Sequence, residues 1–147
     1  MFDSGFGGLT VLREFSKLLP EYSYLYLADA ARAPYGTRDP ENILQCSVEC
    51  VRFLFDAGAK IVIIACNTAT AHAIRPLQQV YFPDKKILGV TIPGAEKVVE
   101  MGYKKIGVIA TSSTVKQKAY KERVHILDTS VGVQEVEAPL LVPLIEA

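Results

Sequence analysis

Cys66 is the residue of this sequence that is best placed to do chemistry. It follows the apolar run 61–65 and precedes Asn67-Thr68, which can begin a helix. The partial positive charge at a helix N-terminus favours the thiolate and lowers the pKa of a thiol. A thiolate in that place can act as a nucleophile or as a general base. The alternative is a buried, inert cysteine, which is a common fate for this residue type.

Other small polar residues also stand directly after apolar segments. They are Asp3 with Ser4, Asp29, Asn67 with Thr68, Thr91, and Thr111 with Thr114. In open α/β sheets, ligands bind beyond the carboxyl ends of the strands. We therefore expect these side chains to gather along one edge of a sheet, where a ligand would bind.

The glycine-rich segment 5–8 is similar to a phosphate-binding turn but matches neither common type. The dinucleotide fingerprint needs a third glycine three positions after the second, and the P-loop needs a lysine after its last glycine. We interpret the segment as a tight turn whose exposed N–H groups bind an anion, because helix starts bind carboxylates. The competing interpretation is a turn that only approaches a packed neighbour.

The remaining cysteines and the histidines do not form a metal pattern. Cys46 and Cys50 lie four residues apart, hence on one helix face, and no further cysteine or histidine stands at zinc spacing. Core packing is the favoured interpretation for both, since cysteine is often buried. His72 and His125 have no recognisable partner and are expected to be structural or surface residues. We therefore predict no metal site.

Short apolar runs alternate with longer amphipathic segments, which predicts an α/β fold with a parallel sheet. Strands are expected at 24–28, 60–65, 86–90, 106–110 and 131–136. Helices are expected at 9–18, 40–57, 68–80, 94–101 and 114–124. Nearly continuous apolar runs are typical of strands that are covered on both faces.

The segment 40–57 carries clear helix signals. Asp39 can cap it, Pro40 suits the first helical position, and Gly58 can end it. Its polar residues form one stripe, which leaves a wide apolar face. The stripe consists of Gln45, Glu49, Arg52 and Asp56. We expect a partner domain to cover the apolar face.

The composition is that of an ordinary globular protein, with 147 residues of which 50% are hydrophobic and 22% charged. Sixteen basic residues balance sixteen acidic ones, so electrostatics gives no case for nucleic acid or an anionic membrane surface. No apolar run is long enough to span a bilayer, and the N-terminus lacks the features of a signal peptide. Three cysteines without tight spacing indicate reduced thiols. We therefore expect a cytoplasmic protein.

Several segments resemble the signature segments of the glutamate racemase family. They read DSGFGGLTV at 3–11, PYGT at 34–37, CNTA at 66–69, GV leading to PG within 89–94, AT and TV within 110–115, and PL followed by VPL within 139–144. A lone Cys-Asn-Thr segment would be weak evidence. The whole set, in the family's order and spread over the chain, is highly specific.

The resemblance implies an α/β, parallel-sheet three-layer sandwich. A first racemase domain would occupy 1–91 and lack its C-terminal completion, and the truncated N-terminal part of a similar second domain would occupy 92–147. Proline and glycine in 91–94 favour a boundary there. The family interconverts L- and D-glutamate without a cofactor and supplies peptidoglycan synthesis. Glutamate would be the small-molecule partner, with no nucleic acid and no membrane, and a homodimer is left open.

In this family two cysteines face opposite sides of the substrate Cα, and one removes a proton while the other returns one. Because the Cα proton is weakly acidic, the base must be held close and desolvated. The resemblance makes Cys66 one of these acid/base groups. It implies substrate contacts by Asp3, Ser4, Tyr35, Gly36, Asn67 and Thr68, with Thr111 and Thr114 helping to hold a carboxylate or the surroundings of the ammonium.

The sequence departs from the family pattern in three places. The family's second catalytic cysteine, in a Gly-Cys-Thr-His segment, lies downstream of residue 147. Only Met1-Phe2 precede Asp3, and the usual Gly-Asp-Thr-Ala-Arg reads ADAAR at 28–32. Two alternatives stay open: a catalytically silent fragment that binds a ligand or partner, and a related racemase acting on aspartate or a hydantoin. By itself the chain is expected to show little or no racemisation.

Overall fold

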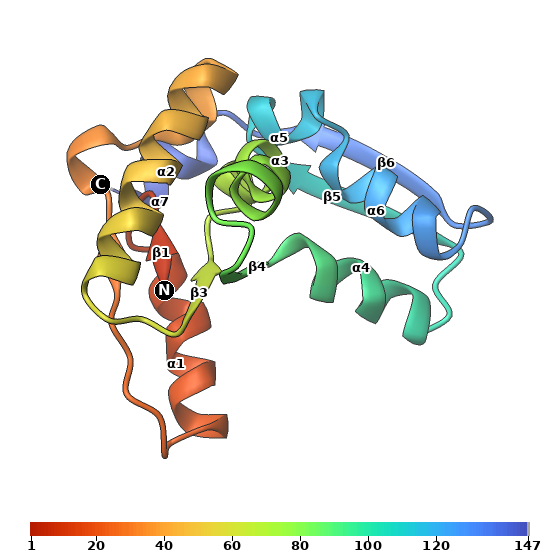
Figure 1. The fold of residues 1–147 in the computed structure, drawn as a ribbon. Coiled ribbons are helices and arrows are strands. Elements are labelled where there is room, and N and C mark those ends of the chain that lie inside the picture. Colours follow the sequence, from red (N-terminus) through yellow and green to blue (C-terminus); the bar gives the residue numbers. More distant parts are fainter. Residues whose placement is uncertain (147) are drawn as a thin grey trace.

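The structure, a computed structural model, describes residues 1–146 (Figure 1). The strands are β1 (Phe2–Asp3), β2 (Leu27–Ala28), β3 (Ile61–Ile64), β4 (Lys86–Gly89), β5 (Lys105–Ala110) and β6 (Gly132–Glu137). The helices are α1 (Gly8–Leu18), α2 (Pro40–Asp56), α3 (Asn67–Pro76), α4 (Thr91–Glu100), α5 (Ser112–Lys116), α6 (Ala119–Leu127) and α7 (Leu141–Glu146). Two 3₁₀ turns, η1 (Ala30–Arg32) and η2 (Tyr35–Thr37), and a π-helical turn, η3 (Leu77–Tyr81), complete the elements.

All strand pairs are parallel, which confirms the expected α/β fold. Strands β1 to β4 form one sheet in the order β2-β1-β3-β4, and β5 pairs with β6 in a second sheet. From β1 the chain passes through α1 to β2 on one side, and then through α2 to β3 on the other side. The strand order therefore reverses between β1 and β3, and such a reversal opens a crevice at the carboxyl ends of the strands.

Helix α2 packs its wide apolar face into the main core. Its buried residues include Val51 and Leu54, which join Phe2, Val62 and Ile64 of the larger sheet in one cluster. The predicted polar stripe of α2 is exposed. The expectation that a partner domain covers this helix is therefore wrong, because the sheet and α3 already bury its apolar side.

The opposite face of the larger sheet is less well covered. The start of α1 meets it where Gly8 lies against Asp3 and Ala65. Farther along, Ile61 and Leu88 are 49% and 54% exposed. Helices thus lie on both faces of this sheet, as a three-layer sandwich requires, but the layer formed by α1 is thin within residues 1–146.

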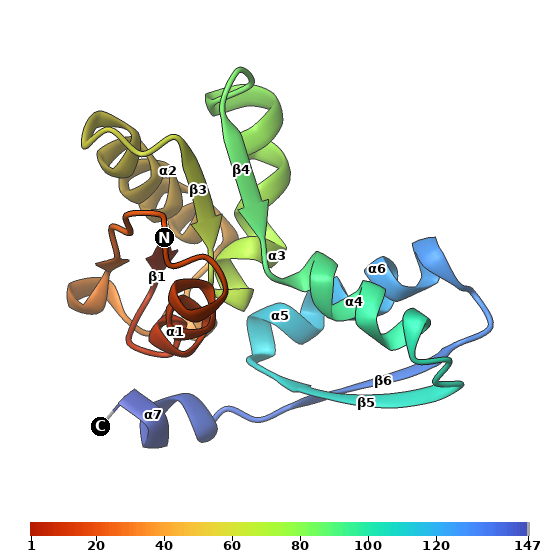
Figure 2. The same ribbon diagram turned by 90° about the horizontal axis from the view of Figure 1, so that it is seen from below.

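The smaller sheet has a core of its own. Ala95 of α4, Val124 of α6 and Val131 before β6 are buried together, with Ile106 and Val133 packed against them. Figure 2 shows α4 leading from the larger sheet to this second group of elements. Two separate cores agree with a division of the chain near 91–94, and that boundary remains a prediction.

Three local expectations differ from the structure. The predicted helix 114–124 is broken into α5 and α6 at Lys118, whose φ of 50° is left-handed. The strand expected at 24–28 is shortened to β2. The helix expected at 94–101 begins earlier, because 91–94 form the first turn of α4, where a proline is tolerated.

The other cysteines and the histidines are packed within the fold. Cys46 and Cys50 are buried and free, as predicted for core residues. His72 Nε2 lies 2.7 Å from Ser113 Oγ, and His125 Nε2 donates to the Val131 carbonyl at 3.0 Å. Within residues 1–146 no cluster of three or more histidines, cysteines or carboxylates could hold a metal ion. In the same range, none of the helices has the length and apolar character needed to cross a bilayer.

We predict that Gly89→Ala lowers the free energy of unfolding by about 1–3 kcal/mol, because it overpacks the core. A Cβ at this position would lie 2.4 Å from Thr70 Cγ2. Thr70 is buried and its hydroxyl donates to the Ile64 carbonyl at 3.2 Å, so the side chain cannot turn away without losing that bond. Urea unfolding checks this, with Gly107→Ala as control, since nothing lies within 4 Å of a Cβ there. Equal stability of the two variants would contradict the prediction.

Candidate active site

The thiol of Cys66 lies at the point where the strand order of the larger sheet reverses. Cys66 follows β3 and caps α3, and its Sγ accepts the Ala69 N–H at 3.3 Å. Ser4 follows β1, and its Oγ lies 3.3 Å from the same sulfur. A thiol and a hydroxyl from two adjacent strands therefore meet at the carboxyl edge of the sheet, where the reversal of strand order predicts a ligand-binding crevice.

The Asp3 carboxylate fixes the chain next to Ser4, at the end of β1 and the start of α1. It is buried, and its two oxygens accept the N–H groups of Ser4 at 2.8 Å and Gly8 at 2.6 Å. Gly8 is needed there, because a Cβ would lie 2.8 Å from both Asp3 Cβ and Tyr26 Oη. The glycine-rich turn was expected to bind a ligand anion. At Gly8 the anion is instead the chain's own carboxylate.

The environment of Cys66 raises its pKa to about 11. Burial is the main cause, since the residue is only 6% exposed, and the negative charge of Asp3 adds to it. Hydrogen bonds from Ser4 and Ala69 act in the opposite direction without overcoming these effects. The expectation of a lowered pKa at the helix start is therefore wrong for this chain. At neutral pH the group is a thiol.

Three threonine hydroxyls near the start of α3 form a hydroxyl cluster, which we define as Thr68, Thr111 and Thr114. The Oγ1 of Thr68 lies 2.9 Å from that of Thr111 and 3.4 Å from that of Thr114, and the latter two are 3.0 Å apart. Thr111 follows β5 and caps α5, where its Oγ1 accepts the Thr114 N–H at 3.3 Å. The predicted strand-end residues Thr68 and Thr111 are thus brought together from the two sheets, whereas Asp29 is bonded to Arg32 and Tyr35 instead.

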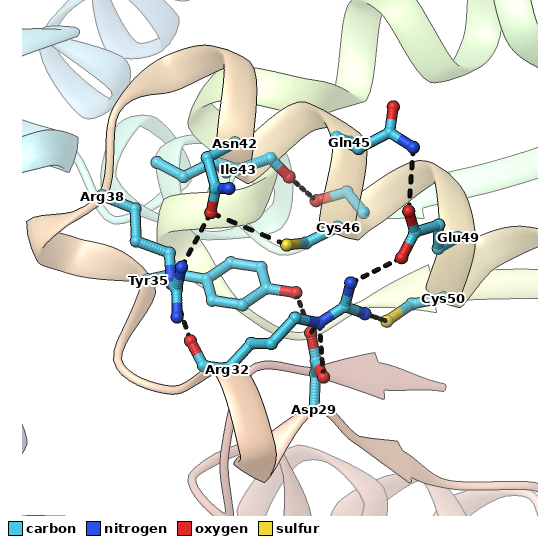
Figure 3. A network of polar contacts seen from close by, with 11 residues as sticks. Asp29, Arg32, Tyr35, Arg38, Asn42, Ile43, Gln45, Cys46, Glu49 and Cys50 are labelled. Carbon is cyan, nitrogen blue, oxygen red and sulfur yellow. Dashed lines mark hydrogen bonds and ion pairs between the residues drawn. The ribbon is translucent and has the colours of Figure 1, made fainter.

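Gly36 forms one wall of this cluster. A Cβ at this position would lie 2.7 Å from Cβ and Cγ2 of Thr111, so the two residues are in close contact through glycine alone. The Tyr35 side chain, also predicted to contact a ligand, is 1% exposed, and its hydroxyl donates to Asp29 Oδ2 at 2.5 Å (Figure 3). Its hydroxyl is therefore engaged inside the protein rather than in the hydroxyl cluster.

Asn67 is exposed, and its Oδ1 accepts a hydrogen bond from the Tyr120 hydroxyl at 2.6 Å. Burial raises the pKa of Tyr120, which keeps the hydroxyl protonated and able to donate. Sequence reasoning did not select Tyr120, and no local pattern marks it. Arg32 was also missed, although its position three residues after Asp29 is the spacing of a helical ion pair.

A family model described as Asp/Glu/Hydantoin racemase matches residues 9–146. The chain belongs to this racemase family. Among curated relatives, the glutamate racemase of Microcystis aeruginosa (strain NIES-843 / IAM M-2473) is 47% identical over 147 residues, which are 100% of this chain and 51% of the relative. The chain therefore spans about half the length of the curated racemases that it matches.

Solved racemase structures share the fold. Glutamate racemase isoform RacE1 from Bacillus anthracis superimposes with a TM-score of 0.92 at 36% identity, over 98% of this chain and 54% of that one. The glutamate racemase of Francisella tularensis, solved in complex with D-glutamate, gives a TM-score of 0.90 at 33% identity, over 98% of this chain and 53% of that one. The fold of this chain therefore corresponds to about half of each of these solved racemases.

We predict that alkylation of Cys66 by iodoacetamide rises steeply from about pH 9 to about pH 11, because only the thiolate reacts. With a pKa of about 11 instead of 9.0, about 100-fold less thiolate is present at neutral pH. Asp3→Asn should shift the curve to lower pH, since it removes a negative charge near the sulfur. Peptide-resolved mass spectrometry measures the rate. A rate that levels off below pH 9 in the unmodified chain would contradict the raised pKa.

Proposed function

We propose that this chain is a portion of a glutamate racemase and that Cys66 is one of its two acid/base groups. The observation that carries the proposal is the placement of the Cys66 thiol between the Ser4 hydroxyl and the Ala69 N–H at the β1/β3 crevice. The names of the matching relatives support the choice of glutamate, and one solved relative holds D-glutamate.

The surroundings of Cys66 suit proton exchange at a weakly acidic carbon. A thiolate with a pKa of about 11 is a stronger base than one with the ordinary value of 9.0. The Ser4 hydroxyl and the Ala69 N–H can stabilise that thiolate by hydrogen bonds. An α-ammonium group of the substrate near the sulfur would lower the pKa of Cys66 and favour the charged form when it is needed.

The hydroxyl cluster suits a carboxylate of the substrate. Hydroxyl hydrogens rotate freely, so Thr68, Thr111 and Thr114 can turn their donors from one another toward an anion. The Asp3 charge favours a cation nearby, which complements this preference. In the proposed reaction protein thiols exchange the proton without a cofactor, and the product serves peptidoglycan synthesis in the cytoplasm.

The second acid/base group is not among the cysteines of α2. Cys50 Sγ lies 3.6 Å from Arg32 Nη2, and Cys46 Sγ lies 3.8 Å from Asn42 Oδ1, so both are engaged on that helix and its neighbours. The chain spans about half of its curated relatives. We therefore propose that the whole protein supplies the second thiol from a segment beyond this chain, on the opposite side of the substrate.

In the complete protein, Cys66→Ala should abolish racemisation of glutamate, a loss of at least about 1000-fold in kcat, because one face of the Cα loses its acid/base. Circular dichroism at 220 nm or a coupled assay for D-glutamate measures the rate, with Cys46→Ala as the matched control that should retain activity. Undiminished turnover by Cys66→Ala would refute the assignment. Aspartate turned over faster than glutamate would favour the related racemase instead.

The 147-residue chain alone should convert little or no L-glutamate to D-glutamate. A single thiol can exchange the Cα proton with solvent on one face, but it cannot protonate the opposite face. Incubation in deuterated buffer, followed by chiral chromatography and mass spectrometry, separates exchange from inversion. Full racemisation by the isolated chain would show that one thiol is sufficient or that a second base is present.

A further inference from the structure

A partly buried polar network lies between α2 and the segment 29–38 (Figure 3). Its centre is the Asp29 carboxylate, which follows β2 and is buried. Arg32 Nε donates to both oxygens of Asp29, at 3.0 and 2.7 Å. The same guanidinium reaches α2, where Nη1 bonds Glu49 at 2.5 Å and Nη2 lies 3.6 Å from Cys50 Sγ. The network therefore ties segment 29–38 to a helix of the main core.

Tyr35 is the second anchor of this segment. Its ring lies 6.2 Å from that of Phe2 on β1, and its hydroxyl donates to Asp29 Oδ2. Burial and the neighbouring Asp29 raise the pKa of Tyr35 far above its ordinary value, so that the hydroxyl remains a donor. Farther along, Arg38 Nε donates to the Arg32 carbonyl at 2.7 Å. The turn η2 is thus held at its first residue and just after its last.

Between these anchors lies Gly36, the residue that touches the hydroxyl cluster. Its contact with Thr111 is closer than any side chain would allow. A shift of η2 by a few tenths of an ångström toward Thr111 would therefore displace the Thr111 side chain. Thr111 in turn bonds both other hydroxyls of the cluster.

We propose that Asp29, Arg32 and Tyr35 are positioning residues that hold Gly36 against Thr111 and thereby set the geometry of the hydroxyl cluster for a substrate carboxylate. This inference rests on the proposed racemase function for the role of the cluster. Tyr35 then acts through its neighbours, and its hydroxyl does not touch the substrate. The network affects how tightly glutamate is held and leaves proton transfer at Cys66 unchanged.

The test is Tyr35→Phe in the complete protein, which removes one hydroxyl and keeps the ring. KM for glutamate should rise about tenfold, the scale of one lost hydrogen bond to a charged group, while kcat changes by less than about twofold. The pH profile of kcat should stay in place, because Cys66 keeps its surroundings. Tyr24→Phe is the matched control, since the Tyr24 hydroxyl donates to the Phe15 and Leu19 carbonyls at the C-terminal end of α1.

A double variant of Asp29 and Tyr35 provides a second test of the proposal. If the two act through each other, Asp29→Asn combined with Tyr35→Phe should raise KM by less than the product of the two single effects. A KM unchanged in Tyr35→Phe, with only a lower unfolding temperature, would overturn the proposal in favour of simple structural support. A fall in kcat at constant KM would also overturn it, because the hydroxyl would then act in the chemical step.

Amide hydrogen exchange tests the positioning step without an activity measurement. The Arg38 amide donates to the Tyr35 carbonyl and the Thr114 amide donates to Thr111 Oγ1. Both should exchange at least about threefold faster in Tyr35→Phe than in the parent and in Tyr24→Phe. Unchanged exchange at both amides overturns the proposal. A parent protein that does not racemise glutamate counts against the proposed function alone, and the exchange result then still decides the positioning step.

Discussion

The site depends on the buried carboxylate of Asp3. Two backbone N–H groups, those of Ser4 and Gly8, converge on it, so the end of β1 and the start of α1 are fixed in one turn. That turn places the Ser4 hydroxyl against the Cys66 sulfur. The same charge raises the pKa of Cys66. One carboxylate therefore fixes the geometry beside the thiol and adds to the effect of burial on the pKa of Cys66.

Two opposing effects act on the pKa of the Cys66 thiol at the start of α3. The N–H of Ala69 and the helix dipole favour the thiolate, whereas burial and Asp3 favour the thiol. Here the second pair is stronger, because desolvation penalises a charge more than one weak N–H···S contact stabilises it. A bound cation is the kind of group that would reverse this balance. The protonation state of Cys66 is thus tied to what occupies the crevice.

The sequence predicts those parts of the site that follow from topology. Apolar runs followed by Ser4, Cys66 and Thr111 mark strand ends, and parallel strands bring such ends to one edge. It does not reveal contacts made by distant packing. The effect of Asp3 on Cys66 joins residues 63 positions apart, and the bond from Tyr120 to Asn67 crosses 53 positions. The break between α5 and α6 also escaped prediction, because a lysine carries no signal for a left-handed conformation.

Helix α3 connects the two halves of the site. Its cap is Cys66, at the crevice of the larger sheet, and its second residue is Thr68, which bonds to Thr111 and Thr114 from the group around the smaller sheet. His72, one turn farther along, lies within hydrogen-bonding distance of Ser113 of α5. A movement of α5 relative to α3 would therefore change the distance between the hydroxyls and the thiol. Because the proposed substrate carries carboxylates, the fit between these two helices sets the geometry in which the hydroxyls of the cluster meet one of them.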